Sequence, residues 1–310
     1  MLKSTPFGMR STADQVLAGI DLTGKRFVVT GCTSGLGFET MSALAANGAQ
    51  VIGLARSLER AEIACRKAGP LCIPVACDLA DLDSVAAAAD TIRSLHDQLD
   101  AIVANAGIAN LPFLETRYGV EMQFLVNHIG HFALLNGILD LVKVGTGRIV
   151  IVSSSASVDY APAEGIMFNN LDGGRFYKPF TFYGQSKLAN ALFAKELSRR
   201  LDARGIAVNS LHPGATRSTG LHRNLSFMPR LALTAAQWFM RSAQRGAATQ
   251  ALLAAHPAVA GISGEYWSNC QIAAGSRLLQ DAELAARLWS VSEQIIARHA
   301  ALPAALRQAA

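Results

Sequence analysis

A tyrosine and a lysine stand four residues apart in the stretch "YGQSK", Tyr183 to Lys187. The stretch lies at the opening of a long helical segment, so this spacing puts both side chains on one helix face. A free phenol has a pKa of about 10, which is too high for efficient proton abstraction at neutral pH, and a neighbouring ammonium lowers it. The pair is therefore a candidate acid/base for moving a proton. A solvated face of an amphipathic helix shows the same spacing, and the pair alone does not separate the two.

A glycine-rich turn, "TGCTSGLG", directly follows the apolar run "RFVVT" and opens a helical segment. Gly31, Gly35 and Gly37 permit a tight turn and a close approach of the backbone to a pyrophosphate. The following helix N-terminus supplies N–H donors and a positive dipole end. The order of strand, turn and helix predicts a dinucleotide site, although the spacing is G-x3-G-x-G rather than G-x-G-x-x-G. A Lys-Ser/Thr pair does not follow the glycines, which disfavours a P-loop.

The end of the second apolar run, "GLARS", bears on the choice of coenzyme. A fold that binds NAD places a carboxylate here for the adenosine ribose, but the sequence has Ala55 followed by Arg56. A guanidinium can hold a 2′-phosphate through two charge-assisted bonds. The sequence thus favours NADP(H) over NAD(H), with an ordinary exposed arginine as the alternative. Asp78, which ends the third run, is either a helix N-cap or a residue within reach of the adenine.

The elements that must position these residues alternate along the chain. Short β-branched runs such as "AQVIGLA", "LDAIVAN", "GRIVIVS" and "GIAVNSLH" are separated by helical segments. This alternation predicts a single-domain α/β fold of the Rossmann type, a doubly wound parallel sheet of about seven strands flanked by helices. Two irregular regions, 156–182 and 215–244, are expected to contact substrate. A capping-box pattern, Thr12-x-x-Gln15, predicts a short helix before the first strand.

The composition excludes several classes of function. Hydrophobic residues make up 51% of the 310 residues and charged residues 16%, as in a globular protein with a large core. The net charge of +5 is scattered without a basic stripe, so we expect no nucleic-acid partner. The five cysteines show no zinc-like spacing, and we expect free thiols and no metal site. Neither a signal sequence nor a long apolar span occurs, so we expect no integral membrane segment and a cytoplasmic location.

The ordered set of motifs resembles the short-chain dehydrogenase/reductase family. The resemblance covers roughly residues 21 to 275 and includes "TGCTSGLG", "NAG" at Asn105 to Gly107, "YGQSK" and "HPG" at His212 to Gly214. Within the family, "VNHIGHFALL", "FYGQSKLANALF" and "GEYWSNCQIA" resemble the branch of retinol dehydrogenases and the WW-domain-containing oxidoreductase. The sequence departs from that branch in lacking a membrane anchor and WW modules.

The resemblance implies four catalytic positions. Tyr183 would be the acid/base, with Lys187 beside it, and Ser154 would bond the substrate oxygen. Ser153 and Ser155 remain alternatives, because a register error of one residue exchanges them. Asn127, inside an apolar helix, would hold through its carbonyl a water that relays protons to the lysine, although a satisfied core asparagine is the alternative. Three histidines without converging ligands are expected to be structural: His128, His131 and His212.

The resemblance also implies a set of coenzyme contacts. Lys187 would hold the nicotinamide ribose hydroxyls. The implied coenzyme-binding residues are Gly31, Thr33, Ser34, Gly35, Leu36, Gly37, Arg56, Asp78, Leu79, Asn105, Ala106, Gly107, Tyr183, Lys187, Pro213, Gly214, Thr216 and Ser218.

The expected function is an NADP(H)-dependent oxidoreductase that interconverts an alcohol with a ketone or aldehyde on a small apolar substrate, retinoid-, steroid- or aromatic-like. A catalytically silent nucleotide-sensing scaffold and a C=C reductase resembling protochlorophyllide reductase are the alternatives. We expect an N-terminal extension over 1–22, the dehydrogenase domain over 23–275 and a helical extension over 276–310. A homo-oligomer is compatible with the family.

Overall fold

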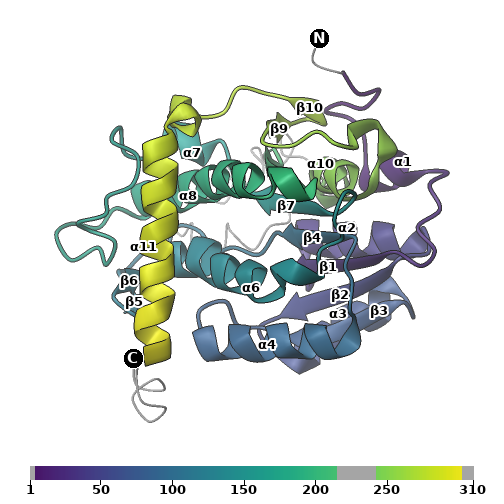
Figure 1. Ribbon diagram of the computed structural model, residues 1–310, viewed down its shortest axis with the longest axis horizontal. Helices are drawn as coiled ribbons and strands as arrows, with labels where there is room; N and C mark the ends of the chain where they lie inside the picture. Colours follow the sequence, from purple (N-terminus) through teal and green to yellow (C-terminus); the bar gives the residue numbers. More distant parts are fainter. Residues whose placement is uncertain (1–3, 215–241, 302–310) are drawn as a thin grey trace, which may run out of the picture.

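A mostly parallel sheet forms the centre of the protein in a computed structural model that describes residues 4–214 and 242–301 (Figure 1). Its strands lie in the order β3 (Cys72–Ala76), β2 (Gln50–Ala55), β1 (Arg26–Thr30), β4 (Ala101–Ala104), β7 (Arg148–Val152), β8 (Ala207–His212) and β9 (Tyr266–Ser268), and neighbours are parallel throughout. An eighth strand, β10 (Gln271–Ile272), pairs antiparallel with β9. The predicted doubly wound sheet is confirmed, with one antiparallel edge strand that the sequence analysis did not predict.

Helices cover both faces of this sheet. One core unites α1 (Ala13–Leu17), α2 (Gly35–Ala46), α3 (Leu58–Ala68) and α10 (Ala243–Ala255) with one face. The second core unites α4 (Leu82–Leu95), α6 (Gly130–Ile138), α8 (Pro179–Arg200) and α11 (Ala282–Ala301) with the other. The short elements are a β5–β6 hairpin (Thr116–Arg117, Val120–Glu121), α5 (Met122–Phe124), a π-helix (Leu125–Ile129), α7 (Ala156–Asp159) and 3-10 turns at Leu139–Leu141, Asp202–Arg204, Pro257–Val259 and Arg277–Gln280.

The strand pattern explains why both faces are covered. Successive side chains of a strand point to opposite faces, and Val28 and Val29 of β1 are both fully buried, in different cores. Val28 pairs with Ile52 on one side and Ile102 on the other, and all three belong to the same core. Apolar side chains on both faces of the central strands therefore require a helical layer on each face.

Both ends of the described chain pack into the domain. The predicted capping box forms, since Gln15 N donates to Thr12 Oγ1 at 3.3 Å and Thr12 N donates to Gln15 Oε1 at 3.0 Å. Helix α1 contributes Val16 and Leu17 to the same core as α2 and α10. Helix α11 lies across α8 and α6 (Figure 1) and adds Trp289 to the core on that side. The division at residues 22 and 275 stays a prediction about sequence segments.

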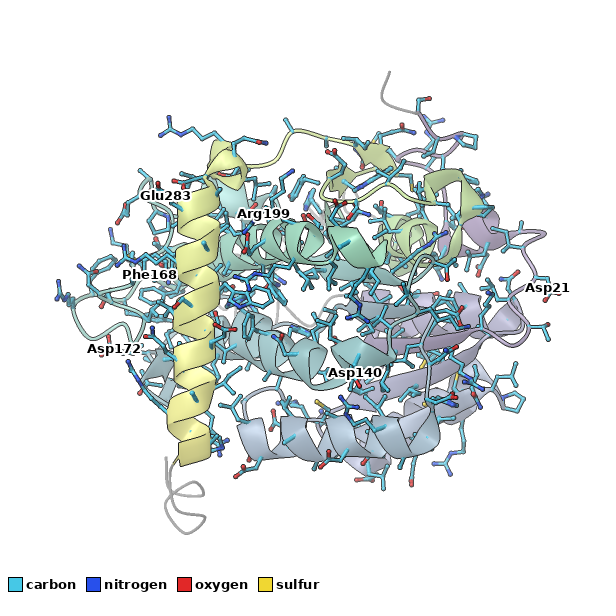
Figure 2. All side chains as sticks on the ribbon, in the orientation of Figure 1. Asp21, Asp140, Phe168, Asp172, Arg199 and Glu283 are labelled. Atoms are coloured by element: carbon cyan, nitrogen blue, oxygen red, sulfur yellow. The ribbon has the colours of Figure 1, made fainter. Side chains whose placement is uncertain are left out.

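The two irregular regions differ in how far the structure describes them. Residues 156–182 begin with α7, continue without regular structure and join α8 at Pro179. Phe168 of this segment lies beside α11 (Figure 2), with the Arg287 guanidinium 4.1 Å from its ring centre. The second irregular region is predicted over 215–244. Its residues 215–241 lie outside the described residues, and its last two residues begin α10.

Candidate active site

Tyr183 stands in the first turns of α8, beside the end of β7. Pro179 occupies the first helical position, where its missing N–H costs nothing. The Ser154 side chain, two residues past β7, forms a hydrogen bond with the Tyr183 phenol. Burial raises the pKa of Tyr183 above its ordinary value, and the bond to Ser154 partly opposes that rise. The phenol therefore keeps its proton at neutral pH, and the lowering of its pKa by Lys187 with oxidised nicotinamide stays a prediction for the complex with coenzyme.

The three serines after β7 have separate environments. Ser153 is buried, and its hydroxyl donates to the backbone carbonyl of Lys187 at 2.7 Å. Ser155 is exposed, and its backbone N–H donates to Nδ1 of His212 at 3.0 Å. Ser154 is the serine whose hydroxyl reaches the phenol. The role of Ser154 towards the substrate oxygen stays a prediction, and the Ser153 hydroxyl links β7 to α8.

Lys187 lies inside the protein rather than on a solvated helix face. Its side chain belongs to a residue only 4% exposed, and Nζ donates to the backbone carbonyl of Val152 at 3.2 Å. Nζ is 5.9 Å from the centre of the Tyr183 ring. Burial lowers the pKa of Lys187 to about 8. A buried ammonium poised near neutral pH beside a phenol is a typical acid/base environment.

Asn127 sits in the π-helix, where a local widening of the helix is common at functional sites. Its Oδ1 accepts from the Ile108 backbone at 2.8 Å, and its Nδ2 donates to the Ile108 carbonyl and to Ser186 Oγ, each at 2.9 Å. A Cβ added to Gly107 would lie 3.0 Å from Asn127 Oδ1 and 3.3 Å from Lys187 Nζ. All the hydrogen-bonding groups of the Asn127 side chain therefore have a partner, as expected for a core asparagine. The side chain also lies near the buried Lys187 ammonium.

The glycine turn packs too closely against itself and the "NAG" segment to admit side chains at Gly31 and Gly37. A Cβ on Gly37 would overlap the Gly31 carbonyl, and one on Gly31, whose φ is +70°, would come 2.9 Å from the Ala106 Cα. The Ser34 side chain, at the N-cap of α2, makes no capping hydrogen bond. The backbone N–H groups in the first turn of α2 are thus not capped by Ser34 and are available to bind an anion. This cradle fits a dinucleotide.

The remaining predicted coenzyme contacts lie at the carboxyl edge of the sheet or just beyond it. Arg56 is exposed immediately after β2, and Thr33 and Ser34 are exposed in the glycine turn. Leu36 and Leu79 are buried. Pro213 and Gly214 follow β8 directly, and Thr216 and Ser218 lie outside the described residues.

Asp78 is not the N-cap of the helix that follows it. Asp81 caps α4, because its Oδ1 accepts from the backbone N–H groups of Asp83 and Ser84 at 3.0 and 3.2 Å. The Asp78 carboxylate instead accepts from the Ala80 N–H at 3.0 Å and stays partly exposed beyond β3. The N-cap alternative for Asp78 is therefore wrong, and its contact with the adenine stays a prediction.

Sequence reasoning missed a set of buried polar groups that tie the "NAG" turn to the rest of the site. The hydroxyl of Thr30 accepts from the backbone N–H groups of Asn105 and Ala106, each at 2.9 Å, and contacts Nε2 of His131 at 2.8 Å. The Asn105 amide donates to the Thr30 carbonyl at 2.8 Å, and Gln250 of α10 donates to Asn105 Oδ1 at 3.1 Å. The signal that could have revealed this set was the presence of polar residues, His131 and Gln250, within otherwise apolar helices.

The fold and this constellation define a dinucleotide-dependent oxidoreductase, and comparison with known proteins gives its family. The short chain dehydrogenase family model matches residues 25–167. The chain belongs to the short-chain dehydrogenase/reductase family. It is 37% identical to human WW domain-containing oxidoreductase over 298 residues, which cover 92% of this chain and 71% of that protein. It is likewise 37% identical to mouse retinol dehydrogenase 14, over 88% of this chain and 86% of that protein.

A solved structure supports the same assignment. The crystal structure of an uncharacterised protein from Mycobacterium paratuberculosis has a TM-score of 0.72 and 31% sequence identity, covering 91% of this chain and 96% of that one. The predicted resemblance to the retinol dehydrogenase and WW-domain-containing oxidoreductase branch is confirmed.

One helical stretch, Met122–Leu141, has the length and hydropathy of a membrane span, but 67% of its most apolar window is buried inside the protein. It carries the buried Asn127 and packs on the sheet. The described residues therefore contain no clear integral membrane segment, and the cytoplasmic location stays a prediction.

Proposed function

We propose that the protein is an NADP(H)-dependent oxidoreductase that interconverts an alcohol and a ketone or aldehyde on an apolar substrate, with Tyr183 as the acid/base. Two proteins of similar fold, RhlG of Pseudomonas aeruginosa and a 3-ketoacyl-(acyl-carrier-protein) reductase of Brucella melitensis, have been solved with NADP and with NADH, which supports a nicotinamide dinucleotide here. The observation that carries the proposal is the convergence of the Tyr183 phenol, the Ser154 hydroxyl and the buried Lys187 ammonium at one sheet edge.

The coenzyme, when bound, supplies or accepts the hydride. In the reducing direction Ser154 donates a hydrogen bond to the substrate carbonyl oxygen and stabilises the negative charge that develops on it. Tyr183 then gives its phenolic proton to that oxygen, which completes the alcohol. The pKa of the phenol, which burial raises, keeps it protonated at neutral pH, so Tyr183 has a proton to give. Lys187, positively charged below a pH of about 8, stabilises the phenolate that remains.

The preference for NADP(H) is supported by Arg56, which is exposed after β2 with no carboxylate at Ala55 to repel a 2′-phosphate. The preference for apolar substrates is supported by exposed aromatic side chains on the segments that flank the site. Phe113 is 78% exposed. The rings of Tyr160 and Phe180 pack at a tilt with their centres 5.3 Å apart, and Phe180 precedes Tyr183 by three residues in α8. Aromatic surfaces of this kind bind retinoid-, steroid- or aromatic-like molecules.

The test is turnover by the wild type and by Tyr183→Phe, with retinaldehyde, a steroid ketone and an aromatic aldehyde as substrates and NADPH absorbance as the signal. We expect the variant to lose about a hundredfold to ten-thousandfold in kcat, because the general acid is gone, while NADPH affinity survives. Tyr160→Phe removes an exposed hydroxyl nearby and serves as the matched control. Near-normal kcat in Tyr183→Phe would overturn the mechanism, and nucleotide binding without turnover of any carbonyl would favour the silent scaffold.

A further inference from the structure

Three cysteine side chains lie between the glycine turn and the outer edge of the sheet. Cys32 follows Gly31 in the turn, Cys65 lies on α3 and Cys72 begins β3. A Cβ added to Gly53 of β2 would lie 3.0 Å from Cys65 Sγ and 3.1 Å from Cys32 Sγ. The thiols of Cys32 and Cys65 form a hydrogen bond with each other. The sulfur beside the predicted pyrophosphate site thus lies near a sulfur on α3, and both adjoin Gly53.

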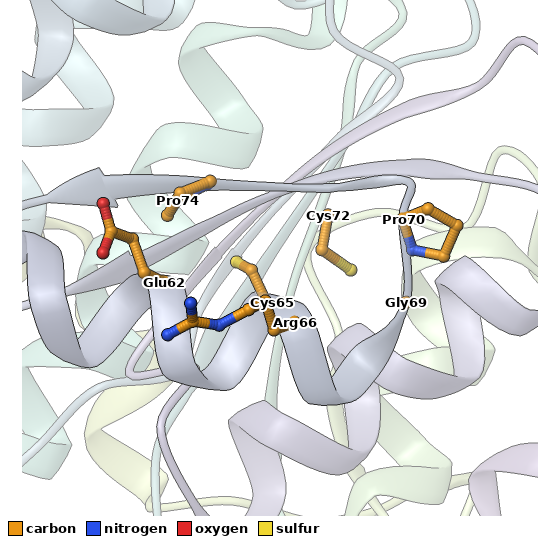
Figure 3. Close-up of a pocket in the computed structure, with 7 residues that line it drawn as sticks. All are labelled: Glu62, Cys65, Arg66, Gly69, Pro70, Cys72 and Pro74. Carbon is orange, nitrogen blue, oxygen red and sulfur yellow. The ribbon is translucent and has the colours of Figure 1, made fainter.

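A cavity of about 610 Å³ lies on the outer side of Cys65, a residue that is 3% exposed (Figure 3). It lies between α3 and the edge strand β3, and Cys65 and Cys72 form part of its wall. The charged side chains of Glu62 and Arg66 stand on the helix side of the cavity. Cys32 does not line it, so a reagent in the cavity meets Cys65 before it can affect Cys32.

The chemistry of the thiols differs along this path. The hydrogen bond from Cys32 lowers the pKa of Cys65, against the opposing effect of burial. Burial raises the pKa of Cys72 to about 12, and that of Cys77, in the core on the other face of the sheet, also to about 12. The thiolate is the nucleophile. Of the two cysteines on the cavity wall, Cys65 therefore ionises and reacts more readily than Cys72.

We propose that Cys65 is a modification site for small disulfides that enter this cavity, and that it passes the oxidation to Cys32 to form a reversible disulfide that weakens coenzyme binding. The second half of the proposal rests on the proposed function, because it requires that the glycine turn holds the coenzyme.

The reaction is two successive thiol–disulfide exchanges. The Cys65 thiolate attacks one sulfur of the small disulfide, forms a mixed disulfide and releases one small thiolate. The hydrogen bond with Cys65 and burial raise the pKa of Cys32 in the reduced pair, and the mixed disulfide removes the Cys65 thiolate. Cys32 then gives up its proton, attacks Cys65 Sγ, forms the Cys32–Cys65 bond and releases the second small thiolate. Two protein thiols are oxidised, one small disulfide is reduced to two thiols, and the two protons from the cysteines leave with them.

The backbone of the glycine turn cannot stay in place when the Cys32–Cys65 disulfide forms. A disulfide bond is about 2.0 Å long, which is shorter than any hydrogen-bonded sulfur pair, so Cys32 and Cys65 must approach each other. The backbone N–H groups of Gly31 and Cys32 both donate to the Leu54 carbonyl, at 2.9 and 3.2 Å. A Cβ on Gly31 would lie only 2.9 Å from Ala106. A displacement of Cys32 towards α3 therefore moves the turn away from the "NAG" segment with which it forms the cradle.

The experiment incubates the full-length protein with oxidised glutathione and measures two independent quantities. Peptide mapping by mass spectrometry detects the Cys32–Cys65 link as a loss of two hydrogens, and NADPH fluorescence gives the dissociation constant before oxidation, after it and after reduction by dithiothreitol. We expect the linked peptide and a rise of roughly tenfold in the dissociation constant, both reversed by the reductant. A misplacement of about 1 Å in a site can cost on the order of a hundredfold, so tenfold is a conservative expectation.

Two variants make the result specific. Cys65→Ser should bind NADPH like the reduced wild type and lose the response to oxidised glutathione. Cys270→Ser changes a buried thiol that lies between β9 and β10, at the other end of the sheet from β3, and contacts Thr249, and this variant should keep the full response. A wild type without the linked peptide, or with the linked peptide and unchanged NADPH affinity, would overturn the proposal. Failure of the proposed function would look different, because the reduced protein would then bind no NADPH while the linked peptide could still form.

Discussion

Nδ1 of His131 donates a hydrogen bond to the backbone carbonyl of Asn127 at 2.9 Å. Because a carbonyl can only accept, the proton is assigned to Nδ1, and Nε2 then accepts from the Thr30 hydroxyl at 2.8 Å. The oxygen of that hydroxyl in turn accepts from the "NAG" turn. Burial lowers the pKa of His131 to about 4, so the ring stays neutral and keeps this arrangement. The carbonyl that the family resemblance gives to a water is thus oriented by a histidine.

We therefore expect His131 to be a positioning residue. His131→Leu should lower kcat by roughly tenfold, because losing one partner of a buried hydrogen bond costs about 1–3 kcal/mol and releases both the Asn127 carbonyl and Thr30. The substrate KM should change little, since the residue does not touch the substrate. The control is His128→Leu. His128 is equally buried and bonds Ser292 of α11 at 2.8 Å, so its loss should reduce stability and leave kcat near normal. Equal kcat values in the two variants would argue against the positioning role.

The sequence predicted the positions of the catalytic and coenzyme-binding residues better than the buried residues that hold them in place. Tyr183, Ser154 and the glycine turn sit at strand or helix ends, and the alternation of strands and helices fixes where those ends meet. The roles of Thr30 and His131 depend on contacts between residues 101 positions apart, which local periodicity does not encode. Asp81 and Asp78 have the same capping chemistry, so only the geometry of α4 separates them.

Coenzyme affinity should weaken as the pH rises through about 8. Burial lowers the pKa of Lys187 to that value from 10.5, so its ammonium is present below it and is lost above it. If the ammonium holds the coenzyme, the NADPH dissociation constant should rise above this pH, by at most about tenfold per unit. A fluorescence titration from about pH 7 to 9.5 measures this, and Lys187→Met should bind weakly with no such slope. A flat wild-type profile would exclude a coenzyme-binding role for the charge.

Arg56 should decide between the two coenzymes. Its guanidinium is exposed after β2 and free of a carboxylate at position 55, so Arg56→Ala should lose about 1.5–3 kcal/mol of a charge-assisted contact with the 2′-phosphate. We expect kcat/KM with NADPH to fall roughly ten- to a hundredfold and kcat/KM with NADH to stay the same. Arg60→Ala changes an exposed arginine four residues later, in the first turn of α3, and is the matched control. A wild type that prefers NADH would contradict the assignment at once.

Helix α11 should be needed for the stability of the domain. The Trp289 ring packs edge-on against Phe132 at 4.9 Å and lies under the Arg200 guanidinium at 4.0 Å, while its N–H donates to Glu293 at 2.7 Å. Trp289→Ala should lower the free energy of unfolding by about 3–5 kcal/mol, measured by urea denaturation, and Trp289→Phe by less.

Because α11 lies across α6 and α8 (Figure 1), removing it should also expose an apolar face that includes Phe132 and Phe193. We expect a truncated chain to associate in sedimentation experiments where the full chain does not, and a full chain that already dimerises through this face would contradict that view.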